Sequence, residues 1–253
     1  MNFIDNSYRQ SDQLNPKFDC VSLLEPNEIY CSENCEICGG FGKVWVDRPL
    51  SDPQFGTLKP CPNINLVQLF IKKCGLKSYE LDYSWGLIKD INNIGKTKNL
   101  LQQFIENSNG FMYIWGDSGL GKTRLLKTMV AESLRKSTPA AYVRMTDMMD
   151  NLRSVYALEN PEPEYSKRIR FWSEIPVLCI DEFDRLKKTP YVEEKTFSIL
   201  DYRYESAMSG QSITVIASNT DPRDLDSYLA DRIFDNRAAV IHVTGISARP
   251  NLS

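Results

Sequence analysis

The sequence predicts an α/β fold in which helices cover both faces of a parallel sheet, giving three layers. From residue 111 onward, short apolar runs alternate with amphipathic stretches, as expected where a helix follows each strand of such a sheet. A glycine-rich turn joins the first apolar run to the first of these helices. Ligands of parallel sheets bind at the carboxyl ends of the strands, so we expect the functional site at that edge.

The spacing of apolar residues gives each element in turn. Strands are expected at 111–115, 141–145, 177–181, 213–217 and 239–243. Helices are expected at 122–136, 147–157, 165–174, 192–209 and 222–235, with a loop rich in proline and glutamate at 159–164. Upstream of the sheet, helical spacing marks 64–78 and 97–107.

Composition divides the chain into three parts. Residues 1–30 are polar and weakly periodic, and we expect a flexible arm there. Residues 31–78 hold a cysteine cluster followed by a helix, and residues 79–253 carry the α/β pattern. The chain has 253 residues, of which 42% are hydrophobic and 25% charged, which suits one large domain with a small appendage.

The sequence contains no signal for a membrane or for secretion. No apolar run approaches the ~18 residues of a membrane span, and the N-terminus lacks a basic region followed by an apolar one. We therefore expect no membrane partner and a cytoplasmic location, in a bacterium or in a phage-infected host. There, the seven cysteines are expected to be reduced thiols or metal ligands.

A phosphate-binding motif, G-x-x-x-x-G-K-[ST], lies between the first strand and the helix that follows it. Its residues are Gly116, Asp117, Ser118, Gly119, Leu120, Gly121, Lys122 and Thr123. Glycines let backbone N–H groups close around phosphates at the N-terminus of the helix, which favours negative charge. Lys122 is expected to reach the β- and γ-phosphates of ATP, and the Thr123 hydroxyl to bind Mg²⁺.

Polar residues end two later strands. Asp181 and Glu182 follow the apolar run 177–180, where Asp181 would complete the Mg²⁺ shell and Glu182 would polarise the water that attacks the γ-phosphate. Asn219 ends the next strand and could hold that water or the γ-phosphate. The alternatives are a strand end capped by solvated acids and, for Asn219, an ordinary turn residue.

Two arginines lie near the end of the last predicted helix and just after it. Arg232 could project into the nucleotide site of a neighbouring subunit and stabilise charge on the transferring phosphoryl group, with Arg237 as a second contact. The alternative is a solvated helix arginine paired with Asp231 or Asp235.

These motifs together resemble the AAA+ ATPases of the DnaC/IstB-like helicase-loader group. The matching segments are GDSGLGKT at 116–123, VLCIDE at 177–182, VIASN at 215–219, ADRIFDNR at 230–237 and GISAR at 245–249. Over residues 81–253, the resemblance implies a P-loop NTPase sheet of order 5-1-4-3-2. It also implies ATP-dependent self-association into an open ring or spiral, and action on a hexameric replicative helicase at single-stranded DNA. Arg249 would be the nearest candidate for a sensor 2-like contact.

The cysteine cluster predicts a structural zinc site. Cys35 and Cys38 form a Cys-x₂-Cys pair on a glycine-rich knuckle, and Cys31 and Cys61 can complete a tetrahedral set. Position 63 is Asn63, where the usual ribbon would have another cysteine. Cys20 and Cys74 are spare ligands, and free thiols or an iron–sulfur or redox role are the alternatives. The lone histidine, His242, is expected to be buried in the last strand.

DNA contacts could come from basic residues in segments that, in related ATPases, face the axis of a ring. They are Arg144, Lys167, Arg168, Arg170, Lys187 and Lys188. A solvated helix face balancing the acidic loop at 159–164 is the alternative, and the net charge of −3 favours neither.

Three functions fit these observations. The first is an ATP-dependent loader of a ring-shaped replicative helicase, and the second a transposition regulator of the IstB type that assembles on duplex DNA. The third, a small-molecule kinase, needs neither Asn219 nor Arg232, and the adjacent Asp181 and Glu182 suit water activation better than transfer to a bound acceptor.

Overall fold

The computed structural model describes residues 23–24, 29–53, 55–64, 66–91, 93–185, 187, 189–225 and 227–245. Most of the expected arm at 1–30 lies outside these residues, as do Cys20, Lys188 and Arg249. No helix of the described part of the chain is long and apolar enough to cross a bilayer.

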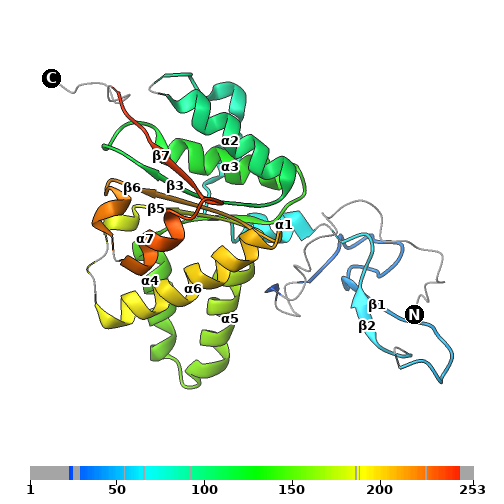
Figure 1. Ribbon diagram of the computed structural model, residues 1–253. Coiled ribbons are helices and arrows are strands. Elements are labelled where there is room, and N and C mark those ends of the chain that lie inside the picture. The colour runs from blue at the N-terminus through cyan, green and yellow to red at the C-terminus, as the bar shows by residue number, and fades with distance from the viewer. Residues whose placement is uncertain are drawn as a thin grey trace.

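A five-stranded parallel sheet forms the centre of the molecule (Figure 1). Its strands are β3 (Gly110–Trp115), β4 (Ala140–Arg144), β5 (Val177–Asp181), β6 (Ile213–Ser218) and β7 (Ala239–His242). Their order is β4-β5-β6-β3-β7. Numbered along the chain and read from the β7 edge, this is 5-1-4-3-2. The order that the resemblance implied is confirmed.

Helices cover both faces of this sheet, as predicted. Figure 1 shows α2 and α3 on one side and α5, α6 and α7 on the other. The helices are α2 (Ile94–Asn107), α3 (Lys122–Arg135), α4 (Met145–Arg153), α5 (Pro161–Glu174), α6 (Pro190–Met208) and α7 (Ser227–Ile233). Short 3₁₀ turns connect them: η2 (Ser78–Glu80), η3 (Trp85–Leu87), η4 (Ser154–Ala157), η5 (Phe183–Arg185) and η6 (Pro222–Asp224).

Two helices differ most at their starts from those expected. Helix α5 starts at Pro161, within the expected loop, because proline suits the first turn of a helix and Glu162 and Glu164 favour its positive end. The expected helix 222–235 divides into η6 and α7, and the Asp221 carboxylate accepts a hydrogen bond from the Arg223 N–H at the start of η6.

Helix α1 (Leu66–Ile71) is shorter than the expected 64–78 because the chain turns at Gly75 to approach β4. Gly75 has a φ of +73°, and a Cβ there would lie 2.0 Å from the Tyr142 carbonyl oxygen. The Tyr142 N–H donates to the Cys74 carbonyl at 2.8 Å, so this segment pairs with the edge strand of the sheet.

The cysteine-rich segment forms a small core of its own. Strands β1 (Lys43–Trp45) and β2 (Leu58–Pro60) make an antiparallel hairpin, and Cys35, Val44 and Cys61 are buried beside it. The following helix belongs elsewhere, because Leu69 and Phe70 pack into the core of the α/β part. Figure 1 shows the hairpin beside the main body, with α1 between them. The division at residues 30 and 78 stays a prediction.

The prediction that His242 is buried is wrong. Strand β7 is at the edge of the sheet, and its side chains alternate in exposure along the strand. His242 is exposed, and its ring stacks on Trp115 with centroids 3.6 Å apart and planes 1° from parallel.

Candidate active site

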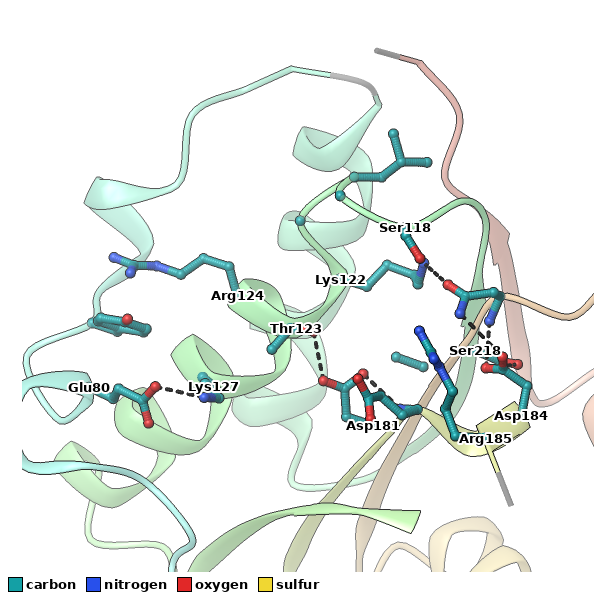
Figure 2. Close-up of a pocket in the computed structure, with 17 residues that line it drawn as sticks. Glu80, Ser118, Lys122, Thr123, Arg124, Lys127, Asp181, Asp184, Arg185 and Ser218 are labelled. Atoms are coloured by element: carbon teal, nitrogen blue, oxygen red, sulfur yellow. Dashed lines mark hydrogen bonds and ion pairs between the residues drawn. The ribbon is translucent and has the colours of Figure 1, made fainter. Parts of the chain in front are cut away.

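A pocket of 320 Å³ opens at the carboxyl ends of β3, β5 and β6 (Figure 2). Its lining comes from the glycine-rich loop, from α3, from the residues after β5 and β6, and from the segment around η2. The lining residues are Glu80, Tyr83, Ser118, Gly119, Leu120, Gly121, Lys122, Thr123, Arg124, Lys127, Asp181, Glu182, Asp184, Arg185, Ala217, Ser218 and Asn219.

The glycine-rich loop adopts a backbone that requires its glycines. Gly116 has a φ of +142°, and a Cβ there would lie 2.1 Å from the Val243 carbonyl oxygen. Gly121, at φ +96°, precedes the first residue of α3. The loop therefore brings its backbone and the N-terminus of α3 to the pocket, an arrangement that favours anions.

Lys122 is 7% exposed, and its ammonium group faces oxygen atoms of the loop and of the residue after β6. Nζ donates to the carbonyl oxygens of Gly116 and Asp117 and, at 3.0 Å, to Oδ1 of Asn219. The buried ammonium thus lies between the phosphate-binding loop and the residue after β6.

Thr123 and Asp181 meet across the pocket. The Thr123 hydroxyl donates to Oδ2 of Asp181 at 2.7 Å, and Tyr142 donates to the same oxygen at 2.9 Å. A hydroxyl and a carboxylate oxygen this close fit neighbouring positions of an octahedral Mg²⁺ shell, whose bonds of about 2.1 Å place adjacent oxygens about 3 Å apart. The donor set and its spacing therefore fit Mg²⁺.

Glu182 lines the pocket in a left-handed backbone conformation, with φ +50°. For a residue other than glycine this costs about 1–3 kcal/mol and persists only where neighbours hold it. Here the Asp181 carboxylate accepts the Glu182 N–H at 2.9 Å, and the Glu182 carbonyl accepts the Arg185 N–H at 3.0 Å.

Asp184 holds Asn219 in place, and sequence reasoning did not identify it. Its carboxylate accepts from the Asn219 N–H at 2.8 Å, from the Asn219 side-chain amide at 3.2 Å and from the Ser218 hydroxyl at 3.1 Å (Figure 2). Burial alone would raise the pKa of Asp184, but these donors outweigh it and hold the pKa below its ordinary value. The signal in the sequence was a further acid shortly after Asp181 and Glu182.

The opposite end of the pocket carries four residues that sequence reasoning also missed. The Arg124 guanidinium lies 3.2 Å from the centroid of the Tyr83 ring, and Lys127 pairs with Glu80 at 2.6 Å. Arg124 and Lys127 are one turn apart on α3, a spacing that helical periodicity could have revealed. In Figure 2 Arg124, Glu80 and Lys127 lie on the other side of Thr123 from Asp184 and Arg185.

Arg232 and Arg237 do not line the pocket of their own chain. Arg232, on α7, pairs with Asp201 of α6 at 3.1 Å, and Arg237 pairs with Asp235 at 2.9 Å. Arg237 also donates to the Tyr204 hydroxyl at 2.8 Å. Their action on a neighbouring subunit stays a prediction.

The four expected cysteines converge. One sulfur from each of Cys31, Cys35, Cys38 and Cys61 lies within 4.8 Å of the others, and the Cys35 and Cys61 sulfurs are 3.7 Å apart. Tetrahedral zinc with bonds of about 2.3 Å requires sulfurs about 3.8 Å apart, so the cluster fits zinc. The Gly42 N–H also donates to the Cys38 sulfur at 3.2 Å.

Of the two spare cysteines, Cys74 is excluded from this set by its position. It is buried in the core of the α/β part, where its thiol donates to the Ile71 carbonyl at 3.0 Å.

Three of the six candidate DNA contacts pair with acids three or four residues away in the chain. Arg144 binds Asp147 at 2.7 Å, Arg168 binds Glu164 at 2.8 Å and Arg170 lies 3.6 Å from Glu174. Lys187 is exposed. These pairs match the alternative of a solvated helix face, and the DNA contacts stay a prediction.

Comparisons with known proteins agree with this fold. A family model described as the bacterial DnaA ATPase domain matches residues 94–240. An ATP-binding protein, so named, of insertion sequence IS232 from Bacillus thuringiensis subsp. berliner is 26% identical over 150 residues, which are 58% of each chain. The chain spans about half the length of the curated relatives it matches.

Solved structures share the fold. A DnaI structure superposes with a TM-score of 0.54 at 19% identity, covering 69% of this chain and 94% of that one. The DnaC helicase loader superposes with a TM-score of 0.53 at 15% identity, covering 66% of this chain and all of the other. The AAA+ fold that the resemblance implied is confirmed. Because the family model covers more than half of the 253 residues, the chain belongs to the family of the bacterial DnaA ATPase domain.

Proposed function

We propose that this chain is an ATP-dependent loader of a ring-shaped replicative DNA helicase onto single-stranded DNA, and that it hydrolyses ATP in the pocket described above. The observation that supports ATP hydrolysis is that two pairs of side chains make close contacts in one pocket. Thr123 lies 2.7 Å from Asp181, and Lys122 lies 3.0 Å from Asn219.

Each side chain has a separate task in hydrolysis. Lys122 and the N-terminus of α3 bind the β- and γ-phosphates, and Thr123 and Asp181 would hold Mg²⁺, which supplies further charge neutralisation when bound. Glu182 accepts a proton from the attacking water, and Asn219, held by Asp184, orients that water or the γ-phosphate.

Self-association would couple this chemistry to loading. Arg232 lies outside its own pocket, on α7, and is 32% exposed along its side chain. An arginine in this place can reach the nucleotide of the next subunit, so that an open ring or spiral forms with ATP bound and loosens after hydrolysis. The helicase would be released at that step.

A helicase as the partner is supported by the similar DnaC structure, which is that of a helicase loader. The cysteine-rich hairpin, with a zinc ion in its four-sulfur cluster, is a module that could dock on a protein. Phe41 on this module is 82% exposed, so its ring is accessible to a partner.

A second candidate function is a transposition regulator of the IstB type acting on duplex DNA. It is supported by the sequence similarity, over 150 residues, to the insertion-sequence protein from Bacillus thuringiensis. The pocket residues serve both functions equally, so the partner decides between them.

Native mass spectrometry distinguishes the two. The protein is mixed with the hexameric replicative helicase of its host, with and without a non-hydrolysable ATP analogue. A defined complex supports the loader. No complex in either nucleotide state, together with filaments on added duplex DNA, supports the transposition regulator.

Lys122→Ala is the control for nucleotide dependence in this experiment, because it removes the ammonium that contacts both the loop and Asn219. It should abolish ATP binding and every ATP-dependent complex. Normal ATP affinity in this variant would contradict the assignment of the pocket.

A further inference from the structure

We propose that Arg185 is a second phosphate-facing arginine that acts within its own subunit, on the γ-phosphoryl group of the ATP bound there. The inference rests on the proposed ATPase function and adds a catalytic residue to it. None of the sequence motifs includes Arg185.

The position of Arg185 follows from the turn after β5. The Arg185 N–H donates to the Glu182 carbonyl at 3.0 Å, closing the 3₁₀ turn η5. This hydrogen bond holds Glu182 and Arg185 together at the two ends of one tight turn. Both line the pocket.

Figure 2 shows the Arg185 side chain rising between Asp181 and Asp184, toward the side of the pocket that holds Lys122 and Ser118. Arg124 and Lys127, the other basic residues drawn beyond Thr123, lie on the opposite side. Arg185 therefore faces the phosphate-binding loop across the pocket.

Neighbouring acids do not neutralise this arginine. The Asp184 carboxylate accepts three hydrogen bonds from Asn219 and Ser218, and the Asp181 carboxylate accepts from Thr123, Tyr142 and the Glu182 N–H. Arg185 forms no ion pair with any carboxylate in the described part of the chain. Its charge is thus available to an anion in the pocket.

An arginine in this place fits the charge that develops during hydrolysis. The water oxygen forms a bond to Pγ while the bond from Pγ to the β,γ-bridging oxygen breaks, leaving its electron pair on ADP. The water proton passes to Glu182 and leaves with the inorganic phosphate. Donation from Arg185 to the γ-phosphoryl oxygens stabilises this transition state, as an arginine supplied by the same chain can.

The test compares Arg185→Ala, Arg185→Lys and the wild type for kcat, KM and ATP affinity, with Arg153→Ala as the control. Arg153 is an exposed arginine on α4 that pairs with Asp150 and does not line the pocket. Arg185→Ala should lower kcat roughly 10²-fold while ATP affinity changes much less, because the contact strengthens in the transition state.

Guanidinium rescue separates a catalytic from a structural role. Arg185→Lys should be intermediate, since lysine keeps the charge without the planar fork. Low concentrations of guanidinium chloride, far below those that unfold proteins, should restore part of the kcat of Arg185→Ala. An unchanged kcat in Arg185→Ala, or a loss of ATP affinity with kcat preserved, would overturn the inference.

Mixing tests whether the arginine acts within one subunit. Lys122→Ala chains cannot hold ATP, so they should leave Arg185→Ala as slow as it is alone while restoring Arg232→Ala. Restoration of Arg185→Ala would place Arg185 in the neighbouring site and overturn the inference. If the wild type binds ATP without hydrolysing it, the ATPase proposal is overturned as well. If the wild type hydrolyses ATP and Arg185→Ala does so at the same rate, only this inference is overturned.

Discussion

The side-chain oxygen of Asn219 accepts a hydrogen bond from Lys122 at 3.0 Å, joining the end of β6 to the phosphate-binding loop after β3. Asp184 holds the amide nitrogen of the same asparagine from the turn after β5. A change at the γ-phosphate that moves Lys122 would therefore also move Asn219 and, through Asp184, the turn η5.

Glu182→Gln should bind ATP with unchanged affinity and lose hydrolysis by about 10²- to 10⁴-fold, because glutamine cannot accept the proton of the attacking water. Phosphate release measured at saturating ATP, together with binding of a fluorescent ATP analogue, checks this. An unchanged rate would place the base elsewhere, and unchanged ADP affinity is the control for an intact pocket.

Arg232→Ala should lose hydrolysis as a pure protein and regain it when mixed with Lys122→Ala, whose chains supply an intact arginine to the neighbouring site. The measurement is ATPase activity as a function of the mixing ratio. If both variants fold and assemble together and activity stays absent, Arg232 does not act between subunits.

The purified wild type should carry one zinc ion per chain, and Cys38→Ser should lose it, because Cys38 is one of four converging sulfurs. Native mass spectrometry before and after chelation gives the metal content. Cys20→Ser is the matched control and should keep its zinc. If Cys20→Ser loses zinc and Cys38→Ser keeps it, then Cys20 and not Cys38 is the fourth zinc ligand.

Glu80 should make stability depend on acidic pH. Burial opposes its ionisation, but the hydrogen bonds from Lys127 and the Lys77 N–H outweigh burial and hold the Glu80 pKa below its ordinary value of 4.5. A carboxyl group whose pKa is lowered by folding stabilises the folded state at pH values above its unfolded-state pKa. This contribution is lost as the pH falls through its folded-state pKa.

Urea unfolding of the wild type and Glu80→Gln measures this effect. At pH 7 the variant should be less stable by about 1–3 kcal/mol, and the difference should shrink below pH 4.5. The exposed Glu106→Gln is the control and should match the wild type. A difference between Glu80→Gln and the wild type that stays constant with pH would mean that the ionisation of Glu80 does not contribute.

Local patterns were sufficient for the motif residues. Glycines, Lys122 and Thr123 are adjacent in the chain, and an apolar run before Asp181 indicates a buried strand that ends at the ligand edge. The physics in each case acts over a few residues, through backbone freedom, strand burial or a helix N-terminus. For the same reason Asn219 could be placed at the end of its strand, and the four cysteines could be proposed together.

Only the tertiary structure decided which distant residues meet these motifs. Tyr83 and Glu80 face the pocket because the segment before α2 brings them there, and Asp184 meets Asn219 because β5 and β6 are neighbours in the sheet. No local spacing encodes either meeting. The tertiary structure likewise placed Cys74 in a different core from Cys61. It also exposed His242, since an apolar pattern marks a strand without saying whether that strand lies at the edge of the sheet, and the edge is set by pairing between segments far apart in the chain.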